Sequence, residues 1–213
     1  MSDTFADLFS TKDRFINKPI GNVSDYYLSG YLNKPEDYIE WFDHIRNALS
    51  TDVIIFHINC FGGDLYTAIQ FIRVMNECEA TIVASIEGAC MSAATMIFLQ
   101  ADEVEVSKHS AFMFHNYSGG TIGKGGEMID QLTYERSWSE NLLKDVYVDF
   151  LTQKEIESML NGKDLWMNSD EVLHRMELKA KLTAKKNNIK PSKAQPSKVQ
   201  NTINSIIDNC FDS

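Results

Sequence analysis

The sequence predicts an α/β fold organised around a largely parallel β-sheet. Residues 53–58 and 81–86 are compact, β-branched runs with the length of buried strands. Each run is followed by a short turn and then by apolar residues at helical spacing, in 65–76 and 88–100. Two strand–turn–helix units in close succession need crossover connections, and these place consecutive strands parallel to one another in one sheet.

Length and composition are those of one cytoplasmic domain. The chain has 213 residues, 44% hydrophobic and 23% charged, which is enough for one substantial core. It has no apolar run of about 18 residues, and its first residues lack the basic flank and apolar stretch of a secretory signal. Four scattered cysteines without C-x-x-C spacing favour reduced thiols over disulfides or a zinc site. We therefore expect a cytoplasmic protein without a bound metal.

Charge is distributed unevenly along the chain. Seven lysines and two aspartates give residues 179–213 a charge of +5, so residues 1–178 carry −15 and the total is −10. An acidic body lacks the clustered cations that phosphate contacts need, which argues against nucleic-acid binding. We interpret the basic end as a solvated tether, with contact to an acidic partner as the alternative.

The N-terminal part begins with a polar segment and continues as strand and helix. Residues 26–32 have the composition of a strand, and a helix is predicted to begin near Pro35, with Asn33 as its possible cap. The β-branched run 53–58 is expected to be a strand covered on both faces and to end where 59–64 break it. Two further short strands are predicted at 104–106 and 111–114.

The C-terminal part contains a long helix and a basic end. A glycine-rich loop at 119–126 lacks the pattern G-x-x-x-x-G-K-[ST], so we interpret it as a bend and not as a phosphate site. The predicted elements that follow are a long helix at 128–150, a shorter one at 154–160, a helix capped by Asn168 or Ser169 that runs to residue 176, a linker at 179–199 and a short apolar stripe at 203–211.

Ser92 is the candidate nucleophile. It follows a glycine-led turn and stands at the N-terminus of a predicted helix, next to backbone N–H groups that have no partner within the helix. A serine hydroxyl becomes a nucleophile when a base takes its proton and donors stabilise the oxyanion that results. Taken alone, Ser92 fits an ordinary helix N-cap better than a nucleophile.

Gly62-Gly63 and Ala93 are the candidates for an oxyanion hole. Paired glycines directly after a buried strand let the backbone approach a ligand closely and direct an N–H group at it. The amides of Gly63 and Ala93 would then form a site with two donors. A tight turn between strand and helix explains the two glycines equally well.

His115 is the candidate general base. It ends the strand 111–114 and is followed by a turn, so we expect it at the edge of the sheet. His109 lies in a turn and is expected to be solvated, whereas the other three histidines have packing or capping positions (His44, His57 and His174). Asp164 is preferred as the orienting acid because it opens an apolar run just past a loop, although spacing alone leaves the other carboxylates open.

Three motifs in this order resemble the Clp protease proteolytic subunit family (ClpP). They are Ile-Asn-Cys-Phe-Gly-Gly-Asp at 58–64, Gly-Ala-Cys-Met-Ser at 88–92 and Met-Phe-His-Asn at 113–116. The Gly-Gly-Asp and Ser-Ala-Ala variants are similar to the phage-encoded branch, including ClpP-like head-maturation proteases. The chain departs from the usual Ser-Pro at Cys60-Phe61, from Met-Gly at Ala93-Ala94 and from a Gly-Leu turn at 176–178.

The resemblance implies a ClpP/crotonase-like spiral of ββα units with a protruding long helix. It assigns Ser92 as nucleophile, His115 as base and Asp164 as the acid that holds the histidine, with oxyanion N–H groups from Gly63 and Ala93. Members assemble as rings of seven stacked in pairs through the long helix and cleave extended peptides, without a metal or organic cofactor. An AAA+ unfoldase is a possible partner.

The likeness covers about residues 26–178, which sets the expected domain organisation. We expect an N-terminal arm at 1–22, a peptidase domain at 23–178, and a basic linker with a short amphipathic tail at 179–213. The expected function is that of a serine endopeptidase inside a self-compartmentalised oligomeric ring, and three alternatives stay open. They are a catalytically silent ring or scaffold subunit, a phage head-maturation protease acting without an unfoldase, and an acyl-CoA enzyme of the crotonase type.

Overall fold

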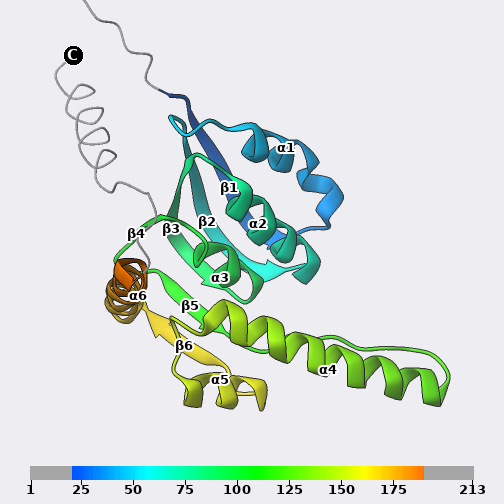
Figure 1. Ribbon diagram of the computed structural model, residues 1–213. Coiled ribbons are helices and arrows are strands. Elements are labelled where there is room, and N and C mark those ends of the chain that lie inside the picture. Colours follow the sequence, from blue (N-terminus) through cyan, green and yellow to red (C-terminus); the bar gives the residue numbers. More distant parts are fainter. Residues whose placement is uncertain (1–20, 190–213) are drawn as a thin grey trace, which may run out of the picture. The chain divides into compact units, whose positions relative to one another are not determined.

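The computed structural model describes residues 21–189 and divides the chain into two units, residues 1–173 and 174–213. The first unit contains a six-stranded sheet in the order β1-β2-β3-β5-β6, with β4 also paired to β3 (Figure 1). Every pairing is parallel except that of β5 with β6. The predicted α/β class and largely parallel sheet are therefore confirmed.

Three long strands form the body of the sheet, and all three are longer than predicted, β1 at its start and the other two at their ends. They are β1 (Val23–Leu32), β2 (Val53–Gly63) and β3 (Thr81–Met91). The sequence predicted breaks after residues 58 and 86, but the strands continue because the Asn59 side chain accepts the Ala89 N–H at 2.9 Å. A Cβ on Gly88 would lie 2.6 Å from that same amide oxygen. Asn59 and Gly88 thus shape an irregularity in the pairing and not a turn.

Three helices cover one face of these strands (Figure 1). They are α1 (Ile39–Asn47), α2 (Leu65–Glu77) and α3 (Ala93–Phe98), and α1 follows a 3₁₀ turn at Pro35–Tyr38. The prediction that Asn33 caps this helix was wrong, because Lys34 stands at the cap position of the 3₁₀ turn and Tyr38 at that of α1, and the Asn33 N–H donates to the Tyr38 hydroxyl. All six residues of α3 are buried, so this helix lies in the core.

The opposite face of β2 is only half covered, which corrects the expectation of burial on both faces. Ile54, Phe56 and Ile58 are buried, whereas the side chains that alternate with them are half-buried. On that face His57 lies between the carboxylates of Asp25 and Glu87. A histidine with two acidic partners belongs on a partly solvated surface, because burying charged groups is costly.

Three short strands extend the sheet towards the candidate site. β4 (Glu103–Val106) pairs with residues 83–86 of β3, and β5 (Ala111–Phe114) pairs with residues 89–91 further along. The last strand, β6 (Leu165–Asn168), runs antiparallel to β5 with Phe114 opposite Leu165. The ends of β3, β5 and β6 are therefore brought together by pairing alone.

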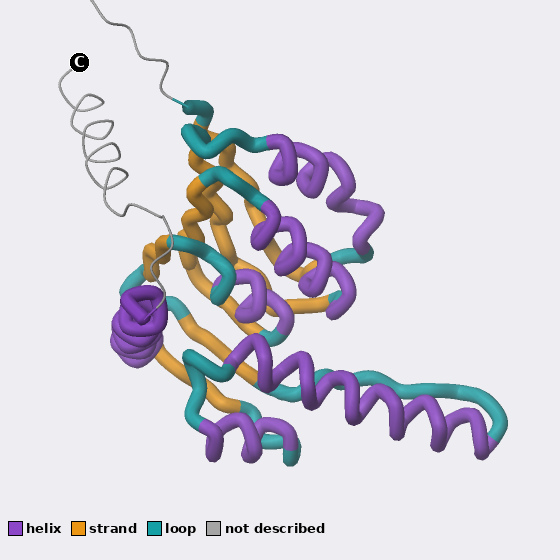
Figure 2. The backbone as a smooth tube through the Cα atoms, in the orientation of Figure 1, coloured by secondary structure: helices purple, strands orange, loops and turns teal. Residues whose placement is uncertain are grey.

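A long helix, α4 (Gly125–Tyr147), follows the glycine-rich loop, and a shorter one, α5 (Gln153–Leu160), follows α4. Figure 2 shows the loop running out beside α4 before the chain turns back into the helix. Thr121 in this loop donates to the side chain of Gln131 on α4, at 2.5 Å. The last two glycines of the segment, Gly125 and Gly126, already belong to α4, which therefore begins and ends three residues earlier than the predicted 128–150. α5 begins with a capping box between Thr152 and Glu155.

The last described helix, α6 (Ser169–Ile189), is longer than predicted. Its first turn is capped by Asn168, which accepts the Glu171 N–H at 3.0 Å. The prediction of a linker from residue 179 was wrong as far as residue 189, because 169–189 hold no Gly or Pro and many strong helix formers. Residues 1–20 of the predicted arm at 1–22, the rest of the linker and the stripe at 203–211 lie outside the described residues.

Candidate active site

Ser92 occupies a strained turn between β3 and α3. Its φ of 55° makes it the one non-glycine residue with positive φ in the described part of the chain. Gly62 makes room for this turn, since a Cβ there would lie 2.6 Å from the Ser92 Cβ. Strained backbone of this kind persists where its surroundings enforce it and is frequent at functional sites.

Both backbone groups of Ser92 are held by neighbouring elements. Its N–H donates to the Met113 carbonyl of β5 at 2.8 Å. Its carbonyl accepts the Thr95 N–H at 2.9 Å and the Thr95 hydroxyl at 2.7 Å. The turn is therefore fixed to β5 on one side and to α3 on the other, and the Ser92 side chain is free to point away from the backbone.

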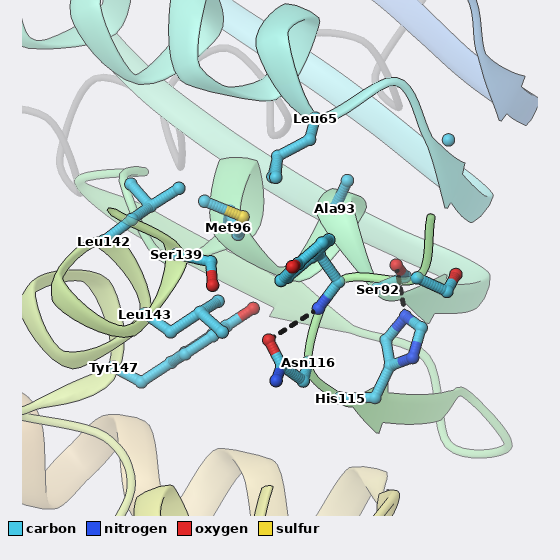
Figure 3. Close-up of a pocket in the computed structure, with 13 residues that line it drawn as sticks. Leu65, Ser92, Ala93, Met96, His115, Asn116, Ser139, Leu142, Leu143 and Tyr147 are labelled. Carbon is cyan, nitrogen blue, oxygen red and sulfur yellow. Dashed lines mark hydrogen bonds between the residues drawn. The ribbon is translucent and has the colours of Figure 1, made fainter. Parts of the chain in front are cut away.

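The Ser92 hydroxyl faces His115 and not the helix it precedes. His115 follows β5 directly, and its Nε2 lies 2.6 Å from Ser92 Oγ (Figure 3). Ser92 makes no side-chain cap bond to α3, so an ordinary helix N-cap does not describe this serine. The imidazole side chain is 22% exposed, which leaves it open to exchange protons.

The other histidines of the first unit have different surroundings. His44 pairs with the Tyr26 hydroxyl, His57 lies between two carboxylates, and His109 is exposed in the turn before β5. His174 belongs to the second unit. His109 is therefore exposed, as expected, whereas His57 is only half-buried between its two acids, so the expectation that it packs inside a core strand was wrong.

Asp164 lies on the other side of the His115 ring. Its Oδ1 is 4.0 Å from His115 Nδ1, which exceeds a hydrogen-bond length, and its side chain is 53% exposed. The antiparallel pairing of β5 with β6 explains this proximity, because His115 and Asp164 directly flank the paired residues Phe114 and Leu165. Spacing along the sequence carries no sign of that pairing.

A small cavity of about 70 Å³ opens beside Ser92 and His115 (Figure 3). Gly63 and Ala93, the predicted oxyanion donors, both line it. The close approach at Gly62 is to Ser92, a backbone contact that sequence reasoning did not identify. The remaining lining residues, most of them also missed, combine apolar walls with hydroxyl and amide groups: Leu65, Met96, Asn116, Tyr117, Ser118, Ser139, Leu142, Leu143 and Tyr147.

Helix α4 supplies four of the lining residues that no sequence motif indicated. Ser139, Leu143 and Tyr147 are buried on the face of α4 that meets the cavity. The helical spacing of apolar residues predicts a buried face for α4, but only the tertiary arrangement shows which element meets that face. The cavity could hold a side chain next to a bond attacked by Ser92.

Cys60 and Cys90 are buried within β2 and β3, and burial raises the pKa of both thiols, which keeps them protonated. Among the described residues, no group of three or more His, Cys, Asp or Glu side chains is arranged to hold a metal ion. Each helix within 21–189 is too short or too polar to cross a bilayer.

A hydroxyl, an imidazole and a carboxylate in this order are the components of acyl transfer with serine as nucleophile. Among known proteins, a model of the Clp protease family matches residues 44–175, well over half of the chain. No curated protein matches the chain. The match covers the family as a whole, so the likeness to its phage-encoded branch stays a prediction. The chain belongs to the Clp protease family, with its ClpP/crotonase-like fold, and is thereby a peptidase of the ClpP kind.

Proposed function

We propose that this protein is a serine endopeptidase that hydrolyses peptide bonds through Ser92, His115 and Asp164. The observation that carries the proposal is the 2.6 Å contact of Ser92 Oγ with His115 Nε2 at a strained, positive-φ turn. A base within hydrogen-bond reach of a serine hydroxyl is the geometric requirement for its activation.

The reaction proceeds through an acyl-enzyme. Ser92 Oγ attacks the carbonyl carbon of the substrate while its proton passes to His115 Nε2. The carbon–nitrogen bond then breaks, and Nε2 returns the proton to the leaving amine. A water molecule enters, gives its proton to the same nitrogen and attacks the ester, which releases the new carboxyl end and restores Ser92.

Two groups of residues assist these steps. The N–H groups of Gly63 and Ala93 stabilise the oxyanion of each tetrahedral intermediate, and both residues line the cavity beside Ser92. Asp164 faces Nδ1, on the opposite side of the ring from Ser92, and favours the imidazolium that forms when Nε2 takes a proton. Its exposure predicts a smaller contribution than that of His115.

The peptidase works as a homo-oligomer, a heptamer or a stacked tetradecamer, with the site inside a chamber. Family members form rings and act on polypeptides, and this chain exposes apolar side chains on and beside the outer end of α4, which suits contact between rings. Those side chains are Ile122, Ile129, Leu132 and Tyr134. The peptidase domain comprises residues 23–178, and an AAA+ unfoldase is a possible feeder of substrate in the cytoplasm.

The test is peptide hydrolysis by Ser92→Ala beside the unaltered protein. We expect the substitution to lower the hydrolysis of unfolded protein and short peptides by roughly 10³-fold or more, with the particle size unchanged. Ser107→Ala, an exposed serine between β4 and β5, is the control. Hydrolysis by Ser92→Ala at the unaltered rate would refute the proposal. A ring-sized particle without hydrolysis in the unaltered protein would favour the silent scaffold.

A further inference from the structure

A buried chain of hydrogen bonds connects the last residue of α4 to the Ser92 backbone. The Thr95 hydroxyl donates its one proton to the Ser92 carbonyl, at 2.7 Å. The Tyr147 hydroxyl lies 2.7 Å from Thr95 Oγ1, and it must be the donor in this pair because the Thr95 proton is already used. Thr95 is 0% and Tyr147 1% exposed, so solvent does not compete for these bonds.

The same tyrosine also contacts the strand that carries His115. Its ring packs edge-on against Phe114, with centroids 5.7 Å apart and an interplanar angle of 84°. Phe114 is the last residue of β5 and directly precedes His115. Figure 3 shows Tyr147 reaching from α4 to the cavity that Ser92 and His115 line. One side chain on α4 therefore touches the supports of both the nucleophile and the base.

The two hydroxyls have no evident use in packing. Phenylalanine and valine would fill nearly the same space as Tyr147 and Thr95, and burying a hydroxyl is unfavourable unless it is hydrogen-bonded. Burial raises the pKa of Tyr147, so the phenol stays protonated and keeps its role as a donor. A fully satisfied buried network fixes a geometry more strictly than apolar contact does.

We propose that Tyr147 and Thr95 are positioning residues that hold the Ser92 turn in line with His115 and so couple α4 to the reactivity of Ser92. The inference rests on the proposed peptidase function. It makes the reactivity of Ser92 dependent on the position of α4, the helix with the exposed outer end. A shift of α4 would reach Ser92 through one tyrosine hydroxyl.

The experiment compares hydroxyl-deleting variants of nearly unchanged shape in the full-length protein. These are Tyr147→Phe, Thr95→Val and their combination, with Thr95→Ser as the variant that keeps the hydroxyl. Tyr31→Phe, whose tyrosine is 69% exposed on β1, controls for the loss of a phenol elsewhere. Three quantities are measured: kcat and KM for a peptide, the rate of fluorophosphonate labelling at Ser92, and the ¹⁵N shifts of the His115 imidazole.

We expect each single variant to lower kcat and the labelling rate by about fivefold to tenfold, the value of one buried hydrogen bond, with KM little changed. The double variant should be no slower than the slower single variant, because both substitutions break one chain. Thr95→Ser and Tyr31→Phe should match the unaltered protein. The His115 ¹⁵N shifts should change in Tyr147→Phe and Thr95→Val alone among the single variants.

Several outcomes would overturn the inference. A lower melting temperature with unchanged kcat and unchanged His115 shifts would make the network structural only. A raised KM with unchanged kcat would make Tyr147 a substrate contact. Failure of the proposed function looks different, because neither hydrolysis nor labelling would occur in the unaltered protein. The ¹⁵N shifts would still decide the coupling then, since they report the contact of Ser92 with His115 without turnover.

Discussion

The residues on the two sides of the His115 ring differ in how strongly the surrounding structure fixes their positions. On one side, Ser92 lies 2.6 Å from Nε2, on a turn whose backbone is bonded to β5 and to α3. On the other side, Asp164 lies 4.0 Å from Nδ1, just before β6, with a side chain 53% exposed. Under the proposed function, this difference means that the nucleophile and base are preorganised, whereas the acid assists from a partly solvated position.

The largest effect should come from the residue that both sides share. We expect His115→Gln to lower kcat/KM by roughly 10³-fold or more, because no other base stands within reach of Ser92 Oγ in the described residues. His109→Gln, in the exposed turn before β5, serves as the control and should leave hydrolysis unchanged. Rates for His115→Gln close to those of the control would remove His115 from the site.

Gly62→Ala tests the side of the His115 ring on which Ser92 lies. The new methyl group would lie 2.6 Å from the Ser92 Cβ at a φ of +88°, so it should displace Ser92 and lower kcat by about 10²-fold. Gly30→Ala is the matched control, because its φ of +79° imposes similar backbone strain with no atom within 4 Å of the new Cβ. Similar kinetics in the two variants would show that backbone strain alone, and not the contact with Ser92, explains any loss.

Asp164→Asn tests the other side of the His115 ring, on which the partly exposed carboxylate lies. A partly exposed pair at this distance contributes on the order of 1 kcal/mol, so we expect kcat to fall about tenfold or less. Asp170→Asn, an exposed acid in the first turn of α6, is the control. A loss as large as that of His115→Gln would mean that the acid is as firmly coupled as the nucleophile, contrary to the difference described above.

The smallest effect on hydrolysis should come from His57, which also contacts two acids but lies away from Ser92. Partial burial lowers its pKa, but hydrogen bonds to Asp25 and Glu87 outweigh this and raise it above the ordinary 6.5. Because its pKa is raised in the folded state, protonated His57 stabilises the fold. This stabilisation is complete at pH values below the unfolded-state pKa and is lost as the pH rises through the folded-state pKa.

We therefore expect His57→Gln to lower the melting temperature more at about pH 5 than at about pH 9, with kcat unchanged at both. Thermal unfolding and peptide hydrolysis across this range provide the measurement. Equal destabilisation at both pH values would contradict the ion-pair account of His57. A fall in kcat would place His57 in the active site.

The sequence predicted element types well where periodicity is local. The helical spacing of apolar residues in α2 and the β-branched runs in β2 and β3 are local patterns, and each predicted the type of its element. The residues at which the strands end carry no such pattern. Asn59 and Gly88 are residue types typical of turns. However, the Asn59 side chain accepts a hydrogen bond from the Ala89 N–H, and both strands continue through these positions. This hydrogen bond joins residues 30 apart in sequence, so local propensity does not predict it.

The residues of the candidate site also differ in whether a local sequence pattern was enough to predict them. Ser92 and His115 stand in recognisable motifs at the ends of strands, so motif order was enough to select them. Asp164 needed the antiparallel pairing of Phe114 with Leu165, and Tyr147 needed the position of α4 against α3. Both depend on contacts between segments far apart in sequence, and neither type of contact leaves a local pattern.

Covalent labelling of Ser92 tests the central claim most directly. The assembled, full-length protein would be treated with a fluorophosphonate, whose phosphorus bonds to an activated serine oxygen as fluoride leaves, and the labelled peptide identified by mass spectrometry. We predict a single label on Ser92, lost in His115→Gln and retained in His109→Gln. Absence of label on Ser92, or equal labelling of Ser92 after His115→Gln, would contradict a nucleophile activated by His115.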